Sequence, residues 1–189
     1  SETPSERKLN QSIINKIPAG LVRLDLPGTF YGSIDPNLFS KFTSITEFNL
    51  GRGAGAYFHP DGVHSGTPLP NIHKTCTTYT AYNNDFRSIA SSSGDNKNIK
   101  ELEDLSYLHI SSNYYLSDGG NFQLSPQNTK INYINLAGTG LNIPNLAGKL
   151  ELQNAYMHYM RASGGLFQGN TYKFNNCSQL NTLYMYSTN

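Results

Sequence analysis

Charged side chains are scarce in this chain of 189 residues, since Asp, Glu, Lys and Arg together make up 14% of it, against roughly a quarter in an average soluble domain. The net charge is +1, and no basic run is longer than Arg7-Lys8. Nucleic-acid binders need a dense cluster of cations facing the phosphates, so the sequence argues against a nucleic-acid partner. Asn, Ser, Thr, Gly and 13 Tyr replace the charged residues. Such a surface favours an extracellular or surface-exposed protein.

Long hydrophobic runs are also absent. No stretch of about 18 apolar residues occurs, so the sequence predicts no membrane insertion. Residues Ser1 to Arg7 contain no apolar signal core. We therefore expect either that a leader has been removed or that the chain is a piece of a longer protein.

Catalytic motifs are missing too. The sequence contains no G-x-S-x-G, no H-E-x-x-H and no paired C-x-x-C. The glycine-rich stretch Gly51 to Ala56 is followed by no helix start, so we interpret it as a loop and not as a phosphate site. Acidic residues are scattered, and nothing selects the pair that a glycosidase needs. The sequence predicts a protein that is not an enzyme and uses no cofactor.

The strongest metal candidate is the segment His59-Pro-Asp61-Gly-Val-His64. Its two imidazoles and one carboxylate could hold zinc or another divalent ion. No fourth ligand accompanies them, and Pro-Asp-Gly is a common turn sequence. A structural loop is the preferred interpretation, and no metal is assigned.

A strand-like frame, apolar-x-x-apolar-x-apolar, recurs along nearly the whole chain. Its copies begin at Leu21, Ile45, Cys76, Leu105, Ile131 and Leu180, with a weaker copy at Ala147. Most spacings lie near the 20–29 residues of leucine-rich repeats. Residues i and i+2 share one face of a strand, and only stacking of the copies buries that face. The sequence therefore predicts an α/β repeat fold, an irregular leucine-rich-repeat solenoid with a parallel sheet on its concave face and loops, turns and short helices on its convex face.

Small or polar residues stand three positions after the last apolar residue of each copy. They are Thr29, Gly53, Asn84, Asn113, Thr139, Ala155 and Thr188. Most of these residue types bond backbone groups at turns. We expect them to satisfy the backbone groups that the sheet leaves open.

A short cap precedes the repeats. Thr3-Pro4-Ser5-Glu6 has the form of a capping box, which predicts a helix from Pro4 to Lys16. Its apolar face would hold Leu9, Ile13 and Ile14.

The predicted organisation has two parts. Residues 1–16 would form an N-terminal helical cap or the end of a preceding repeat, and residues 17–189 a solenoid of about seven units. The chain stops at Asn189, directly after a predicted strand, whereas a solenoid usually ends in a polar cap. We expect the natural protein to continue beyond Asn189, or another chain to cover this end.

The last copy carries a resemblance to a known family. It reads Phe174-Asn-Asn-Cys177-Ser-Gln-Leu180-Asn-Thr-Leu183-Tyr-Met185 and resembles the cysteine-bearing leucine-rich repeats of bacterial surface proteins, often called BspA-like. The same frame returns as Phe39, Phe42, Ile45, Phe48 and Leu50, and as Ile99, Leu102, Leu105, Leu108 and Ile110. Lys173 replaces the family alanine, and Tyr186 the family proline. The resemblance implies a binding role on a cell or virion surface and names no ligand.

The two cysteines, Cys76 and Cys177, belong to copies four units apart. At about 4.8 Å between neighbouring strands, that separation is roughly 20 Å, whereas a disulfide needs Cα atoms within about 7 Å. We predict two unpaired, buried, apolar side chains.

Alternate residues of the strand copies line the predicted concave face. Its middle row holds Asp25, Asn49, Thr80, His109, Asn135, Glu151 and Tyr184, the row before it Arg23, Glu47, Thr78, Tyr107, Tyr133, Lys149 and Thr182, and the row after it Tyr82, Ser111, Gln153 and Tyr186. Tyrosines beside hydroxyls and amides offer rigid contact area with adaptable hydrogen bonds. The predicted ligand-binding residues are Tyr82, Tyr107, His109, Tyr133, Asn135 and Tyr184. Two alternatives are binding through loops or edges, and a spacer role in which aromatic pairs only stabilise the sheet.

These features predict a non-catalytic binding module for a protein or glycan on a cell or particle surface. The alternative is a structural or adaptor component of a phage or virion assembly, such as a tail or fibre, that contacts other subunits.

Overall fold

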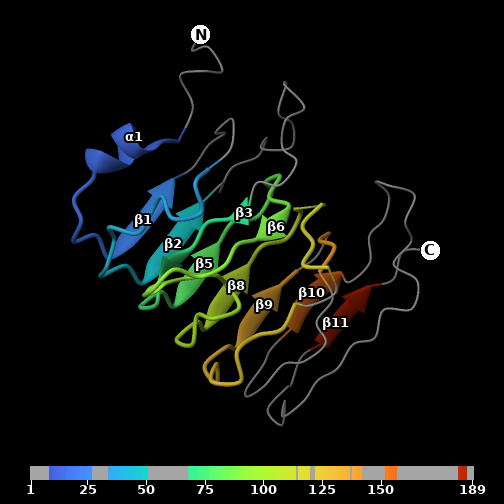
Figure 1. Ribbon diagram of the computed structural model, residues 1–189. Helices are drawn as coiled ribbons and strands as arrows, with labels where there is room; N and C mark the ends of the chain where they lie inside the picture. Colours follow the sequence, from blue (N-terminus) through green and yellow to red (C-terminus); the bar gives the residue numbers. More distant parts are fainter. Residues whose placement is uncertain are drawn as a thin grey trace.

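The computed structural model describes residues 9–26, 34–50, 68–113, 115–119, 122–136 and 138–141, and the backbone of two further strands at 152–156 and 183–186. A seven-stranded parallel sheet, the main sheet, runs through these residues in the order β1-β2-β5-β8-β9-β10-β11 (Figure 1). Its strands are Arg23–Leu26 (β1), Glu47–Leu50 (β2), Thr78–Thr80 (β5), Tyr107–His109 (β8), Tyr133–Asn135 (β9), Leu152–Tyr156 (β10) and Leu183–Tyr186 (β11). The predicted parallel sheet is confirmed.

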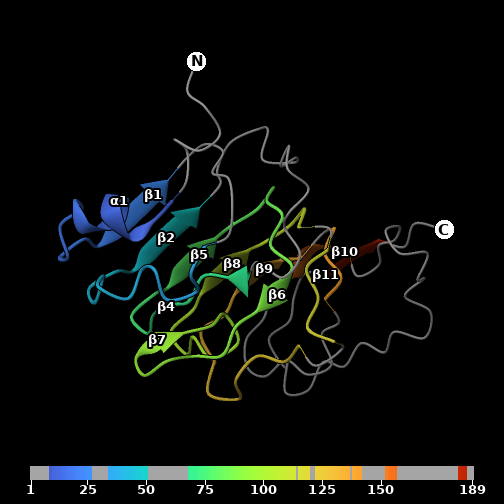
Figure 2. The ribbon, with the colours of Figure 1, turned by 45° about the horizontal axis from the view of Figure 1, so that its top comes forward.

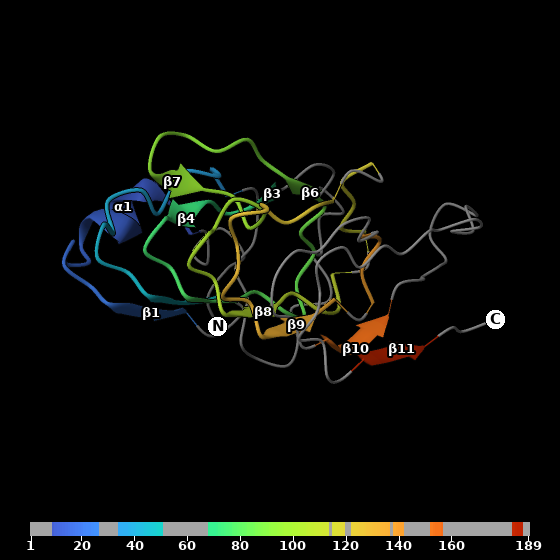
Figure 3. The ribbon, with the colours of Figure 1, turned by 90° about the horizontal axis from the view of Figure 1, so that it is seen from below.

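Two small sheets and a short helix lie opposite the main sheet (Figure 3). The strands β3 (Pro68–Leu69) and β6 (Ser88–Ile89) pair in parallel, whereas β4 (Ile72–His73) and β7 (Asn96–Lys97) pair antiparallel. Helix α1 (Gln11–Asn15) is the only helix in the described part of the chain. In Figure 2 the chain runs from β4 back to the main sheet as β5. Within the described residues, no helix is long and apolar enough to cross a membrane.

The space between the two layers is filled by the apolar positions of the strand frame. In the copies that begin at Ile45, Cys76, Leu105 and Ile131, all three apolar positions are buried. In the first copy Leu24 is buried, and Leu21 and Leu26 pack against the core. Side chains at i and i+2 of a strand share one face, so each copy sends its apolar pair to the same side. The frame therefore predicted the core side of β1, β2, β5, β8 and β9 correctly.

Aromatic rings fill the N-terminal half of this core. The ring of Phe48 lies edge-on to Phe39, with 4.9 Å between their centroids, and tilted against Tyr79 at 5.0 Å. The buried hydroxyl of Tyr79 donates a hydrogen bond to the carbonyl oxygen of Pro70 at 2.8 Å. The one polar atom of this aromatic group is thus satisfied, as burial requires.

Hydroxyl side chains fix the register where each strand begins. Thr46 donates both its backbone N–H and its Oγ1 to the carbonyl oxygen of Val22, at 2.8 and 3.3 Å. Thr77 makes the same two bonds to Thr46, at 2.8 and 3.2 Å, and Ser106 makes them to Thr77, at 2.8 and 3.1 Å. We call Thr46, Thr77 and Ser106 the hydroxyl ladder. The sequence frame does not reveal it, because each of these residues stands at a position without an apolar signature.

Of the residues predicted at the turns, Asn84, Asn113 and Thr139 bind backbone groups as expected. Thr29, Gly53 and Thr188 lie outside the described residues, and only the backbone of Ala155 is described. Asn113 is fully buried, and its Nδ2 donates to the carbonyl oxygens of Ala81 and Ile110, both at 2.8 Å. Its Oδ1 accepts from the N–H of Phe86 at 3.1 Å. Asn84 donates to Leu50 and Tyr82 in the same way, and Thr139 donates to Leu136 at 2.8 Å. The bonds of Asn84 to Leu50 and of Asn113 to Ala81 join successive turns of the chain, whereas that of Thr139 stays within one turn.

The predicted N-terminal helix is wrong in its extent. Helix α1 begins at Gln11, because Asn10 is extended (φ −139°, ψ 172°) and caps it by accepting from the N–H of Ile13. Of the predicted apolar face, Leu9 and Ile14 are buried, whereas Ile13 is 36% exposed. The capping box at residues 3–6 lies outside the described residues. Only one side chain of this five-residue helix, Ile14, is buried. The apolar pattern of the longer predicted helix therefore does not describe α1.

The weak copy at Ala147 was placed two residues too early. Leu152, and not Leu150, pairs with Ile134 of β9 and with Leu183 of β11. An alternating pattern fits a strand equally well after a shift of two residues, so the apolar pair Leu150 and Leu152 could not decide the register. The prediction that Glu151 belongs to the middle row of the concave face is therefore wrong.

The short helices predicted behind the sheet are absent from the described connections between strands. Successive turns take their place between β1 and β2, where Leu38, Ser40 and Phe42 each donate a backbone N–H to the carbonyl three residues earlier. Each of these turns is closed by a single hydrogen bond, which is too little to start a continuous helix.

Cys76 is a free, fully buried thiol, and its Sγ donates to the carbonyl oxygen of Thr78 at 3.2 Å. Burial raises the pKa of this thiol to about 12, so it stays protonated and unreactive. This confirms the prediction for Cys76. Cys177 lies outside the described residues.

Replacing Asn113 by Ala is expected to lower the free energy of unfolding by about 2–4 kcal/mol, because it leaves two buried carbonyls and the N–H of Phe86 without partners. Urea unfolding measures the change. The control is Asn132→Ala at an exposed position whose backbone bond to Ser106 survives, where we expect a change within about 0.5 kcal/mol. Equal effects of the two substitutions would show that Asn113 is not a structural bridge.

Candidate functional site

The register of the main sheet decides which side chains share its outward face, the face turned away from the two small sheets. Two rows cross β1, β2, β5, β8 and β9: Arg23, Glu47, Thr78, Tyr107 and Tyr133 in one, and Asp25, Asn49, Thr80, His109 and Asn135 in the other. These are the rows that the strand frame predicted, and their composition is confirmed over five strands. Their role in ligand binding stays a prediction.

Four rings form a continuous group on this face, which we call the aromatic cluster: Tyr82, Tyr107, His109 and Tyr133. Tyr107 and Tyr133 stack with centroids 4.1 Å apart and an interplanar angle of 4°. Tyr82 stacks on His109 at 4.4 Å and 18°, and His109 meets Tyr133 edge-on at 6.3 Å. The strand spacing of about 4.8 Å allows this stacking, because side chains at matching positions stand parallel to one another.

His109 is held as a neutral ring inside this cluster. Its Nε2 lies 2.8 Å from the Oγ of Ser111 and 3.3 Å from the Nδ2 of Asn135. An amide nitrogen only donates, so Nε2 acts as the acceptor for Asn135. Burial lowers the pKa of His109 to about 4, because desolvation disfavours the charged form. The centre of the cluster therefore carries no charge near neutral pH.

The other end of the outward face is ionic. The guanidinium of Arg23 lies 3.3 Å from Asp25 and 3.4 Å from Glu47. We call these three residues the ionic zone. Between it and the aromatic cluster, Thr80 donates to the Oδ1 of Asn49 at 2.6 Å. The face thus changes from charged side chains on β1 and β2 to aromatic and neutral polar ones on β5, β8 and β9.

The arrangement brings most of the predicted site residues together. Tyr82, Tyr107, His109 and Tyr133 touch one another, and Asn135 donates to both His109 and the hydroxyl of Tyr133. Tyr184 belongs to β11, two strands beyond β9, and only its backbone is described. Sequence analysis did not select Ser111 or the ionic zone as site residues, although it placed all four residues in the correct rows. The missing signal is the pairing of these side chains within and between rows, which only side-chain geometry reveals.

The metal candidates His59, Asp61 and His64 lie outside the described residues. Within the described ranges, no group of three or more His, Cys, Asp or Glu side chains could hold a metal ion. The side chains of the outward face offer ring edges, hydroxyls, amides and a few charges.

No family model, curated protein or solved structure matches this chain.

Lowering the pH from about 7 to about 5 is expected to weaken the fold through His109. Its folded-state pKa of about 4 lies below the ordinary 6.5, so the unfolded chain binds a proton first as the pH falls. The contribution of His109 to stability is complete above pH 6.5 and is lost between 6.5 and 4. Urea unfolding at both pH values should show a smaller loss for His109→Gln than for the parent. An equal loss in the two proteins would mean that the ring is not held neutral.

Proposed function

We propose that this chain is an irregular leucine-rich-repeat solenoid, similar to the BspA-like repeats, that binds a partner protein and catalyses no reaction. Three features support the repeat. The strands of the main sheet follow one another in chain order, the frame positions are buried, and Asn84 and Asn113 each bind a backbone carbonyl of the preceding turn. Each unit buries its apolar edge only against its neighbours, which is how a solenoid is stabilised.

The observation that carries the binding role is the aromatic cluster on the outward face. Tyr82, Tyr107, His109 and Tyr133 are half-buried, with neutral polar side chains around them. Large rigid side chains that lose little entropy on binding, beside adaptable hydrogen-bonding groups, are typical of recognition surfaces. A surface-exposed location fits the low charge and the many hydroxyl and amide groups of the whole chain.

The orientation of the rings favours a protein over a glycan. A sugar packs its C–H groups against the open, electron-rich face of an aromatic ring. Tyr107 and Tyr133 cover one face of each other, and Tyr82 and His109 do the same. Stacked rings that stand on a sheet turn their edges outward, while the hydroxyl of Tyr133 accepts from the Nδ2 of Asn135. Ring edges suit the rings and carbonyls of a protein surface.

Binding of the labelled chain to intact cells tests this proposal. The panel should include bacterial and animal cells, each untreated, shaved with protease, or treated with glycosidases. We expect protease and not glycosidase treatment to remove binding. Tyr107→Ala/Tyr133→Ala should weaken binding about tenfold or more, because buried aromatic anchors each contribute more than about 1 kcal/mol.

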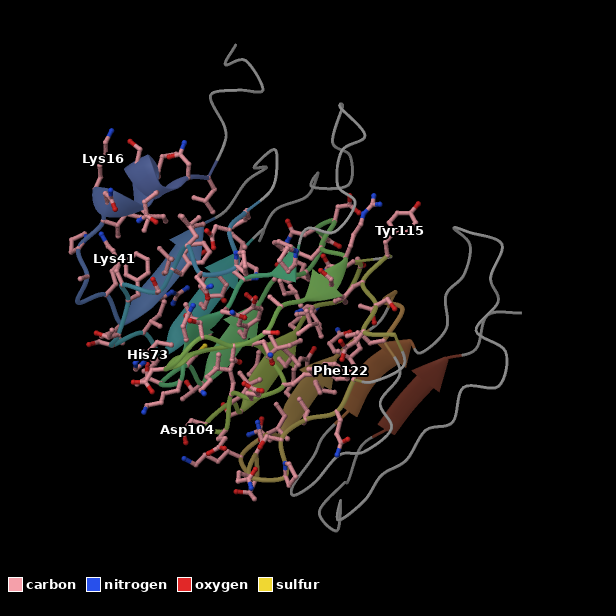
Figure 4. The ribbon with its side chains drawn as sticks, viewed as in Figure 1. Lys16, Lys41, His73, Asp104, Tyr115 and Phe122 are labelled. Atoms are coloured by element: carbon pink, nitrogen blue, oxygen red, sulfur yellow. The ribbon has the colours of Figure 1, made fainter. Side chains whose placement is uncertain are left out.

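Tyr115→Ala is the matched control, since Tyr115 is an exposed tyrosine outside the aromatic cluster, with the guanidinium of Arg87 lying 4.7 Å from its ring centroid. Figure 4 shows it at the end of the molecule opposite His73 and Asp104. Circular dichroism and the melting temperature establish that each variant is folded. Loss of binding in Tyr115→Ala, with none in the double variant, would move the binding site away from the outward face.

A further inference from the structure

The outward face carries two unlike zones in one row. Glu47 on β2 pairs in register with Thr78 on β5, which pairs with Tyr107 on β8 and then Tyr133 on β9. A ligand that lies across the strands along this row meets the ionic zone first and the aromatic cluster afterwards. The two zones therefore define both the chemistry and the spacing of what can bind both at once.

The ionic zone selects a cation. Glu47 is 43% exposed at its side chain, and its ion-pair partner Arg23 also lies within 3.3 Å of Asp25. One guanidinium thus serves two carboxylates. From β5 to β9 the two described rows and the flanking Tyr82 and Ser111 hold hydroxyls, amides, phenols and a neutral imidazole. A lysine or arginine of the partner is complementary to Glu47, and it meets no positive charge in these described rows from β5 to β9.

The aromatic cluster selects an aromatic side chain. The stacked pair of Tyr107 and Tyr133 presents ring edges, which carry partial positive charge. The negative face of another ring lies favourably across such edges, in the same edge-to-face geometry that His109 and Tyr133 already adopt at 70°. A phenylalanine or tyrosine of the partner would extend this packing outward.

The spacing between the zones sets the separation of the two side chains. Glu47 lies two strands from Tyr107 and three from Tyr133, or about 10 and 14 Å. An extended chain advances about 3.3 Å per residue and turns alternate side chains to opposite sides. Side chains two, four or six residues apart share a side, and they are separated by about 7, 13 and 20 Å. Only the separation of four residues falls within the range.

We propose that the outward face binds an extended segment of a partner protein in which a lysine or arginine and an aromatic residue stand four positions apart. The basic side chain pairs with Glu47, and the aromatic ring packs on Tyr107 and Tyr133. This inference rests on the proposed function and deepens it, since it names the chemistry and spacing of the partner. The order of the two residues along the segment depends on the direction in which it crosses the strands.

A series of synthetic peptides tests the spacing. Each has a Gly/Ser background, blocked ends, one Arg and one Tyr, at separations of two to six residues and in both orders. Chemical-shift titration into the isotope-labelled full chain gives the dissociation constants. We expect the separation of four, in one order, to bind about threefold more tightly than three or five, the factor that one exposed ion pair or one aromatic pair supplies. Salt should reduce this preference.

Two variants separate the two contacts. Glu47→Gln should remove the advantage of Arg over norleucine in the best peptide and leave the aromatic contact, whereas Tyr107→Ala/Tyr133→Ala should remove the aromatic contact. Glu103→Gln, at an exposed position outside the strands, is the matched control and should behave like the parent.

The outcomes distinguish this inference from the proposed function. Equal binding at all separations, lost in the double tyrosine variant, would overturn the spacing rule and support a protein-binding face. Failure of every peptide to shift outward-face resonances, while cells still bind through Tyr107 and Tyr133, would overturn the extended segment alone. If neither peptides nor cells bind, both proposals are wrong. A glycan that shifts the same resonances where peptides do not would replace the protein partner.

Discussion

The hydrogen bonds that align each strand of the main sheet with the next determine which side chains lie on each of its two faces. The hydroxyl ladder of Thr46, Thr77 and Ser106 doubles the backbone bond at the start of β2, β5 and β8. A slip of one residue would turn Leu108 outward and Tyr107 into the core. The buried core and the half-buried aromatic cluster on the outward face are therefore two consequences of one register.

The turns in the connections between the strands create a second constraint. Each turn leaves backbone carbonyls that no strand can satisfy, and unsatisfied buried groups are expensive. The side-chain amide of Asn113 satisfies three such groups, because it donates to two carbonyls and accepts from one N–H. Asn128 acts similarly, since its Nδ2 donates to the carbonyl oxygen of Leu102 at 2.8 Å and its Oδ1 accepts from the N–H of Ile131 at 3.1 Å. Buried amides thus act as spacers that hold successive turns at a fixed distance.

The same close spacing shapes the outward face. Matching positions on neighbouring strands stand near enough for Tyr107 and Tyr133 to stack, and stacking removes water from His109 as well. The lowered pKa of His109 and the outward direction of the ring edges have this common origin. A chain with the same tyrosines on more widely separated loops would offer open ring faces and a different partner chemistry.

The pattern of apolar residues was enough to predict the parallel sheet, its core side and the rows of its outward face over five strands. It could do so because apolar residues spaced three and two apart, as in Leu105, Leu108 and Ile110, force alternate side chains to opposite sides. The extent of α1 and the register of β10 were wrong, because Ile13 and the pair of Leu150 and Leu152 satisfy more than one local arrangement. The position of His109 between Tyr82 and Tyr133, and the pairing of Arg23 with Glu47, came only from the folded chain. These contacts join residues about 20 to 30 positions apart, where distance in space depends on how the turns stack and not on any local pattern.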